Sequence, residues 1–227
     1  MSSGATLRFD AVILAGGRSS RLGGEPKANL VIGQEPLLVR ALRAAEGAVH
    51  TAVAGPASLR GLLAAADFSG LLVREDPPFS GPAAAVGAAL TALGEPAAGT
   101  AGHPGPSPWT LVLACDMPQA HEAVPALLAA AELDPAKSVL AVDAGGKTQP
   151  LAALYRTGDL AAAVDARAGG LANLSMFSML ARVQWREVAV PEGSTADVDT
   201  WADAGKWGIQ TGPRAAAPPG PAAAAKD

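Results

Sequence analysis

The sequence predicts an α/β fold in which a mostly parallel sheet lies between two layers of helices. Short apolar runs alternate along the 227-residue chain with longer stretches of helical periodicity. A repeated order of strand and helix is typical of a parallel sheet covered on both faces. The rhythm changes in the C-terminal half, where a turn joins two extended runs, so we expect an antiparallel element there and a mixed sheet.

Five apolar runs predict strands buried on both faces, at residues 11–15, 51–54, 71–73, 109–114 and 139–142. Between them, helices are predicted over residues 36–48, 58–66, 81–93 and 122–133, where apolar residues recur three or four positions apart. Residues 143–147 favour a turn, and 149–155 are a second extended run. We then expect helices over 160–168 and 171–182, a strand over 186–190, and a short helix capped by Thr200.

The length suits one domain, which we place at residues 10–208. Residues 1–9 are predicted to be a flexible N-terminus. Residues 94–108, with four glycines and four prolines, are predicted to be a mobile insertion, and residues 209–227 a disordered tail without a periodic apolar face.

Composition excludes several classes of function. Cys115 is the single cysteine and the three histidines have no ligand spacing, which excludes a disulfide framework and argues against a zinc site. A formal charge of −4 provides no basic field for nucleic acid. No apolar run is long enough to span a membrane and no secretory signal is evident, so we expect a soluble cytoplasmic protein.

The strongest local signal follows the first predicted strand, at residues 14–27 (LAGGRSSRLGGEPK), which we call the glycine loop. Its four glycines let the backbone turn sharply and approach a ligand, while Arg18, Arg21 and Lys27 supply cations. Open α/β sheets bind ligands at the carboxyl ends of their strands. The glycine loop therefore predicts a polyphosphate site, and the alternative is a surface turn with solvated charges.

The glycine loop resembles the signature L-A-G-G-x-S-x-R-M-G-x-x-K of the nucleotidyltransferase (NTP transferase) family, and especially of its molybdenum cofactor guanylyltransferases. Four further segments match motifs of that family in order: residues 75–85, Leu-Ala-Cys-Asp-Met-Pro at 113–118, Gln-Pro-Leu at 149–151 and Asp-Val-Asp-Thr at 197–200. Five ordered motifs are a far more specific signal than one glycine loop.

The resemblance implies a Rossmann-like fold and a Mg²⁺-dependent transfer of GMP from GTP to the phosphate of molybdopterin, with Mn²⁺ as an alternative ion. It implies the following roles: catalysis by Lys27, Arg21 and Asp116; nucleotide binding by Leu14, Ala15, Gly16, Gly17, Arg21, Lys27, Asp76, Gly81 and Asp116; metal binding by Asp116 and Asp199; acceptor binding by Gln149 and Pro150. Its partners would be small molecules, with transient contact to a molybdoenzyme or a cofactor-inserting protein.

Each implied acid has a structural alternative. Asp116 could cap a helix that starts near Pro118. Asp197 and Asp199 could serve only the dipole of the following helix, and Asp76 could be a solvated loop acid. Cys115 follows a buried strand without a histidine nearby, which favours a core thiol over a nucleophile.

Several positions depart from the family pattern: Pro26 stands where an acid is usual, Leu22 where a methionine is, and Ala85 where a glycine is, and residues 174–180 contain no arginine. Three functions therefore stay open. The first is a guanylyltransferase, favoured by the adjacent Gly16 and Gly17 that distinguish it from cytidylyl relatives. The second is a transferase using CTP or a sugar or alcohol phosphate, and the third is a nucleotide-binding regulator without turnover.

Overall fold

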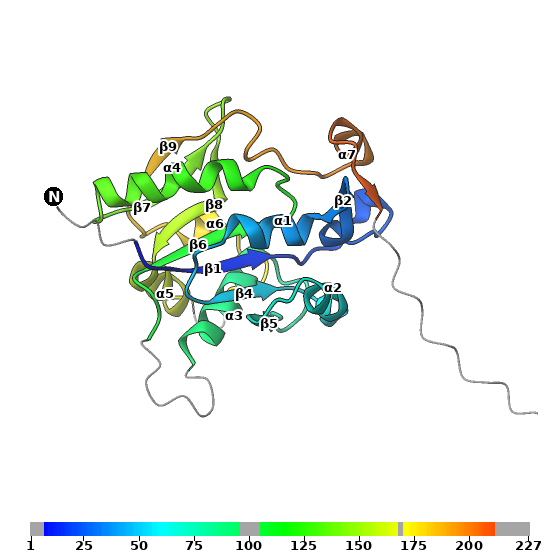
Figure 1. Cartoon of the computed structure of the whole chain (residues 1–227). Coiled ribbons are helices and arrows are strands. Elements are labelled where there is room, and N and C mark those ends of the chain that lie inside the picture. The colour runs from blue at the N-terminus through cyan, green and yellow to red at the C-terminus, as the bar shows by residue number, and fades with distance from the viewer. Residues whose placement is uncertain (1–6, 96–104, 168–169, 212–227) are drawn as a thin grey trace, which may run out of the picture.

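A central sheet organises the structure, a computed structural model that describes residues 7–95, 105–167 and 170–211 (Figure 1). Its seven strands lie in the order β5-β4-β1-β6-β8-β7-β9. Their bounds are β1 Phe9–Leu14, β4 Thr51–Ala54, β5 Leu71–Val73, β6 Trp109–Ala114, β7 Ser138–Val142, β8 Thr148–Arg156 and β9 Trp185–Ala189. β8 runs antiparallel to both of its neighbours, and the other neighbouring pairs are parallel. The predicted mixed sheet is confirmed.

Helices cover both faces of this sheet. Figure 1 shows α1 (Leu37–Ala44) and α4 (Ala120–Leu133) on one side, with α3 (Pro82–Gly94) and α5 (Thr157–Asp165) on the other. Strand β1 shows why: Ala11 and Ile13 belong to the core under α1 and α4, whereas Val12 and Leu14 belong to the core under α3 and α5. Successive side chains of a strand point to opposite faces, so an entirely apolar strand must be covered twice.

The predicted helix over residues 171–182 is wrong. Only the single turn α6 (Met176–Met179) is helical there, and Ser175 caps it by accepting a hydrogen bond from the backbone of Ser178 at 3.1 Å. Asn173 has a φ of +60°, a left-handed conformation that interrupts a right-handed helix. Helix α2 (Arg60–Ala65) is likewise shorter than expected, because a 3₁₀ turn (Ala57–Leu59) precedes it.

A second, three-stranded sheet was not predicted. It consists of β10 (Gln210–Thr211), β2 (Leu30–Ile32) and β3 (Glu35–Pro36), and its strands are too short to show periodicity. Helix α7 (Trp201–Lys206) packs beside it around a small core that contains Leu22, Leu30 and Val198. This unit joins the C-terminal segment to the end of the glycine loop.

The fold reaches beyond the predicted domain bounds. Phe9 is buried in β1, Ser107 is buried beside Asp10, and Ile209 is buried next to β10. Residues 9, 107 and 209–211 are therefore part of the folded domain. The remaining predictions for the two ends and for the 94–108 insertion fall largely on residues 1–6, 96–104 and 212–227, outside the described residues. Across the ranges that the structure describes, no helix has the length and apolar character needed to cross a membrane.

Candidate functional site

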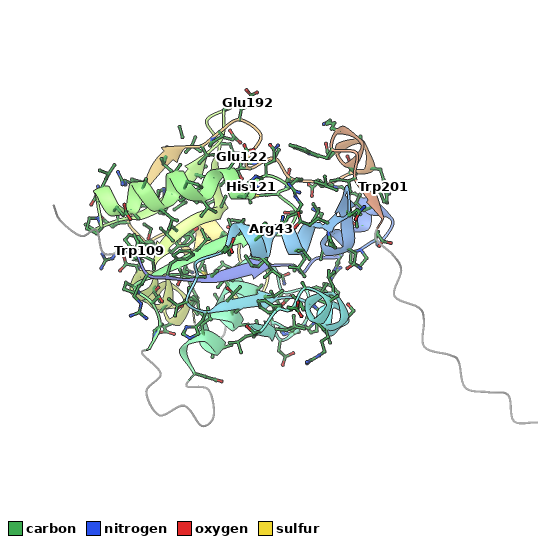
Figure 2. All side chains as sticks on the ribbon, in the orientation of Figure 1. Arg43, Trp109, His121, Glu122, Glu192 and Trp201 are labelled. Carbon is green, nitrogen blue, oxygen red and sulfur yellow. The ribbon has the colours of Figure 1, made fainter. Side chains whose placement is uncertain are left out.

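The carboxyl ends of β1 and β6 bring two of the sequence motifs together. The backbone N–H of Cys115 donates to the carbonyl of Leu14 at 2.9 Å, so the two strands stay paired up to the point where their loops begin. Figure 2 gives the direction: Trp109, the first residue of β6, lies at the left, and Trp201 of α7 lies at the right, beyond the carboxyl ends of the strands. The glycine loop and the loop that carries Asp116 therefore begin side by side.

A third segment joins them from the C-terminal part of the chain. The backbone N–H of Val198 donates to the carbonyl of Asp116 at 3.0 Å, and the Val198 side chain is fully buried. This contact fixes Asp197 and Asp199, on either side of Val198, next to Asp116. Within the Asp-Val-Asp motif, the buried Val198 side chain thus anchors the two carboxylates that flank it.

Lys27 lies between two carboxylates. Its Nζ donates to Oδ2 of Asp116 at 2.7 Å and to Oδ1 of Asp199 at 2.5 Å. The side chains of Lys27 and Asp116 are each 19% exposed, whereas that of Asp199 is 41% exposed and also accepts from Nη1 of Arg21 at 3.0 Å. The geometry is that of a charged centre buried on one side and open on the other.

The pKa values in this centre shift in opposite directions. Burial alone would lower the pKa of Lys27, but the charges and hydrogen bonds of its two carboxylates outweigh burial and raise it. Burial raises the pKa of Asp116, with Lys27 opposing the shift and Asp197 reinforcing it. The hydrogen bond from Lys27 lowers the pKa of Asp199. Lys27 therefore stays positively charged at neutral pH and can bind an anion.

A cavity of about 560 Å³ opens above this centre. Its walls come from the ends of several strands and from α3 and α6. The lining residues are Leu14, Gly16, Gly17, Arg18, Lys27, Glu75, Phe79, Gly81, Pro82, Ala85, Ala114, Cys115, Asp116, Met117, Lys147, Thr148, Gln149, Pro150, Leu151, Phe177 and Asp197. Its size lies within the range of small-molecule sites.

The glycine loop forms one wall with its backbone. Gly17 has a φ of +132°, which L residues rarely adopt, and a Cβ added there would meet nothing within 4 Å. A wall without side chains lets a ligand approach the backbone amides. Gly81, the N-cap of the 13-residue helix α3, and Pro82, its first residue, also line the cavity, so the positive end of this helix faces it. Both features favour an anionic ligand.

Most of the predicted nucleotide and acceptor residues lie here. Those that line the cavity are Leu14, Gly16, Gly17, Lys27, Gly81, Asp116, Gln149 and Pro150. Ala15 lines a smaller adjoining cavity of about 320 Å³, which shares Gly16, Gly17 and Phe79 with the larger one. Arg21 lies outside both linings and reaches the centre through its ion pair with Asp199.

Asp76 is placed differently. It is exposed and absent from the linings of both cavities, whereas its neighbour Glu75 lines the larger one. The carboxylate of Glu75 also accepts the backbone N–H of Phe79 at 2.9 Å. The nucleotide role of Asp76 stays a prediction.

Several cavity residues had no role predicted from the sequence, among them Glu75, Phe79, Lys147 and Phe177. Glu75 was within a quoted motif, and Lys147 was within the predicted turn at 143–147, so a signal existed for both. Phe177 lies within residues 174–180, where the family resemblance predicted an arginine, so the segment carried a signal although the residue itself did not.

The structure also decides two of the structural alternatives. Helix α4 begins at Ala120 with Gln119 at its N-cap, so Asp116 does not cap it. Thr200 caps α7 as predicted, together with Asp203 in a reciprocal capping box. Cys115 is buried, and burial raises the pKa of its thiol, which agrees with a core residue.

The donor set suits a hard divalent cation. Among the residues the structure describes, no three His, Cys, Asp or Glu side chains gather into a complete metal site. Asp116 and Asp199 present two neighbouring carboxylates, both in contact with Lys27 Nζ, and Asp197 adds negative charge nearby. Mg²⁺ commonly takes one or two protein carboxylates and completes its shell with water and substrate phosphates. The residues present therefore fit such an ion.

Comparison with known proteins identifies the family. The profile of the MobA-like NTP transferase domain matches residues 11–183, which contain the glycine loop, Asp116 and Gln149. The chain belongs to the MobA-like NTP transferase family. It is therefore a nucleotidyltransferase, and enzymes of this family generally use a nucleoside triphosphate with a divalent metal ion. The family resemblance expected from the motifs is confirmed.

Solved structures share the fold. Molybdopterin-guanine dinucleotide biosynthesis protein A from Archaeoglobus fulgidus is 16% identical, with a TM-score of 0.64 over 88% of this chain and 96% of that one. A 2-C-methyl-D-erythritol 4-phosphate cytidylyltransferase from Thermus thermophilus is 18% identical, with a TM-score of 0.61 over 88% and 97%. No curated protein sequence matches the chain. At these identities the structural comparison establishes the fold, not the substrates.

Proposed function

We propose that this nucleotidyltransferase transfers GMP from GTP to the phosphate of molybdopterin and releases pyrophosphate. The observation that carries the proposal is the position of Lys27 Nζ, between Asp116 and Asp199, in a cavity that the glycine loop and Gln149 also line. One cavity thus combines a cationic centre for phosphate with the residues predicted to hold each substrate.

The chemistry follows from charge. A phosphate oxygen of the acceptor attacks the α-phosphorus of the nucleotide, and the bond from that phosphorus to the oxygen bridging to the β-phosphate breaks, so pyrophosphate leaves with the electron pair. A phosphate monoester is already anionic at neutral pH, so a strong general base is unnecessary. The main obstacle is repulsion among the anions.

Residues of this chain offset the repulsion among the phosphates. Lys27 places a permanent positive charge at the centre, and the amides of the glycine loop and the first turn of α3 add fixed dipoles. Arg21 holds Asp199 in place from the solvent side. A divalent ion held by Asp116 and Asp199 would neutralise phosphate charge and align the reacting groups.

The choice of GTP and molybdopterin has separate support. Gly16 and Gly17 follow the guanylyl form of the signature rather than the Ala-Gly of cytidylyl relatives. The Archaeoglobus fulgidus structure carries the name of a molybdopterin-guanine dinucleotide biosynthesis protein. We assign the reaction to the cytoplasm, as the sequence suggested. Transient delivery of the product to a molybdoenzyme or an inserting protein would follow from this role.

A cytidylyltransferase is the second candidate. Its support is the fold shared with the Thermus thermophilus enzyme, whose acceptor is an alcohol phosphate. The lack of an arginine at residues 174–180 also weakens the family's expected contact to molybdopterin.

A nucleotide panel tests the choice. The midpoint of thermal unfolding is measured with GTP, CTP, ATP and UTP, each with Mg²⁺, because a ligand that binds the folded state raises it. We expect the largest rise with GTP, followed by pyrophosphate release from GTP and molybdopterin. A rise with CTP alone would favour the second candidate. Nucleotide binding without pyrophosphate release would favour a regulator.

A further inference from the structure

Two exposed phenylalanines share the cavity. The chain has only four phenylalanines, and two of them, Phe79 and Phe177, are each 46% exposed and line the cavity. Burying an aromatic ring away from water is favourable, so exposed rings inside a concave site indicate that a ligand covers them. Nothing in the transfer chemistry itself uses either ring.

Phe79 is held in a fixed orientation. Its φ is +64°, an uncommon conformation for a bulky residue, and Glu75 accepts its backbone N–H at 2.9 Å. The guanidinium carbons of Arg18 and Arg74 lie 5.6 and 5.4 Å from the centroid of its ring. Uncommon backbone conformations that persist often mark functional sites. The surroundings therefore fix this ring where it stays partly open to solvent.

The position of Phe79 associates it with the nucleotide. It lines both the 560 Å³ cavity and the adjoining 320 Å³ cavity, together with Gly16, Gly17 and Arg18 of the glycine loop. A nucleotide with its phosphates at Lys27 and along the glycine loop would bring its base to this wall.

Phe177 lines the larger cavity but not the adjoining smaller one. It belongs to α6, whose position is set by the Ser175 cap and by buried Met176 and Met179. Gln149 and Pro150, the predicted acceptor residues, line the same cavity from β8. Phe177 also lies within residues 174–180, the segment in which an arginine was expected and none occurs.

Gln149 adds a polar contact to this region. Its Nε2 donates to Oδ2 of Asp143 at 2.9 Å, and Oδ1 of Asp143 accepts the backbone N–H groups of Gly145 and Lys147, each at 2.9 Å. The amide of Gln149 is thereby oriented, and its oxygen can accept a hydrogen bond from a ring N–H of a ligand. Asp143 is a positioning residue for this side of the cavity.

We propose that the cavity has two aromatic walls with separate substrates: Phe79 stacks on the base of the nucleotide, and Phe177 stacks on a planar nitrogen heterocycle of the acceptor. This inference rests on the proposed transfer reaction, and it restricts the acceptor to phosphates that carry a planar ring. A polyol phosphate has no ring for Phe177 to cover. Lys27 and Asp116, which line the same cavity, would receive the phosphates of both ligands.

Direct binding tests the two walls without turnover. Dissociation constants are measured by calorimetry for GTP with Mg²⁺ and for neopterin monophosphate, with glycerol 3-phosphate as an acceptor that lacks a ring. Removing a stacked aromatic side chain weakens binding roughly tenfold. We expect Phe79→Ala to weaken GTP about tenfold and leave the pterin phosphate unchanged. Phe177→Ala should do the reverse, and glycerol 3-phosphate should respond to neither.

Matched variants separate stacking from other effects. Phe177→Trp keeps a planar ring and should retain pterin binding, whereas Phe177→Leu keeps apolar volume and should lose it. Leu133→Ala, an 83% exposed residue on α4 outside the cavity lining, should change neither constant. The thermal midpoint of each variant without ligand should match that of the parent, since the rings are exposed.

Defined results would overturn the proposal. Equal weakening of one ligand by Phe79→Ala and Phe177→Ala, no effect of either, or full binding by Phe177→Leu would each do so. Failure of wild type to bind the pterin phosphate would overturn the role of Phe177. If wild type binds both ligands as described but releases no pyrophosphate, the proposed transfer is wrong, and the assignment of one ligand to each phenylalanine is retained.

Discussion

Nζ of Lys27 lies 2.7 Å from Oδ2 of Asp116 although 89 residues separate the two in the chain. The pair forms because β1 and β6 are parallel neighbours, so the loops that follow them leave the same edge of the sheet. An ammonium on the 3₁₀ turn Lys27–Asn29 thereby meets a carboxylate that follows a buried strand. Both groups are mostly hidden from water, where electrostatic interactions are stronger than at the surface.

Asp199→Asn should raise the Mg²⁺ concentration needed for half-maximal activity about tenfold, because one carboxylate oxygen contact is weakened. Asp159→Asn is the matched control, since Asp159 is likewise an exposed carboxylate paired with an arginine, Arg156, but lies outside the cavity lining. Activity is titrated with Mg²⁺ at saturating nucleotide. An unchanged Mg²⁺ requirement in Asp199→Asn would remove this residue from the metal site.

Gly17→Ala should weaken GTP binding about tenfold, because its Cβ would obstruct the open backbone wall, and strain at a φ of +132° should lower stability by roughly 1–2 kcal/mol. Gly33→Ala provides the control, because Gly33 also has a positive φ and open space around it but lies in the turn between β2 and β3. Both variants should lose stability, and only Gly17→Ala should lose affinity in a binding titration. Equal affinities would show that the glycine loop does not approach the nucleotide.

Asp10→Ala should lower the free energy of unfolding by about 2–4 kcal/mol without lowering the activity of the folded enzyme. The buried Asp10 carboxylate accepts from the backbone and side chain of Ser107, at 2.7 and 2.9 Å, and from the backbone of His50 at 3.2 Å. It lies near the amino end of β1, away from the site. Denaturant unfolding measures the loss, which Asp10→Asn should partly restore. A loss of activity in the folded variant would contradict this separation.

Acid should weaken the attachment of α7 through Asp203. Hydrogen bonds from Lys206 and Thr200 lower the pKa of Asp203 to about 2. Since the unfolded value is about 3.9, the contribution of Asp203 is fully present above roughly pH 4 and is lost as the pH falls through 2. The difference in unfolding free energy between wild type and Asp203→Asn, measured from pH 5 to pH 2, should therefore shrink. A difference independent of pH would contradict the capping role.

Much of the fold was predictable because buried strands carry a strong signal. The strands at residues 51–54, 71–73 and 109–114 were placed with their observed bounds. The small sheet escaped prediction, since β3 and β10 have two residues each and depend on the packing of Leu22 and Val198. Residues 171–182 have helical spacing, but the left-handed Asn173 and the Ser175 cap confine the helix to one turn.

The site was predictable where the motifs leave a strand end. The residues after β1 and β6 can only emerge at the carboxyl edge of the sheet, so the meeting of Lys27 and Asp116 followed from topology and family resemblance. The loop before α3 carries no such constraint, and the sequence did not determine whether Glu75 or Asp76 would face the cavity. Whether Phe177 would line the cavity depended on where helix α6 begins and ends, and local periodicity could not locate those ends.

Turnover after removal of the Lys27 or Asp116 side chain shows whether this pair carries the transfer reaction. Pyrophosphate release is measured for Lys27→Ala and Asp116→Ala with saturating substrates and Mg²⁺, with folding checked by circular dichroism. Lys206→Ala, which removes a surface lysine outside the site, is the control. We expect a fall of at least ~10²-fold in each of the two variants and none in the control, because each variant loses a preorganised charge. Near-normal turnover in folded Asp116→Ala or Lys27→Ala would contradict this expectation.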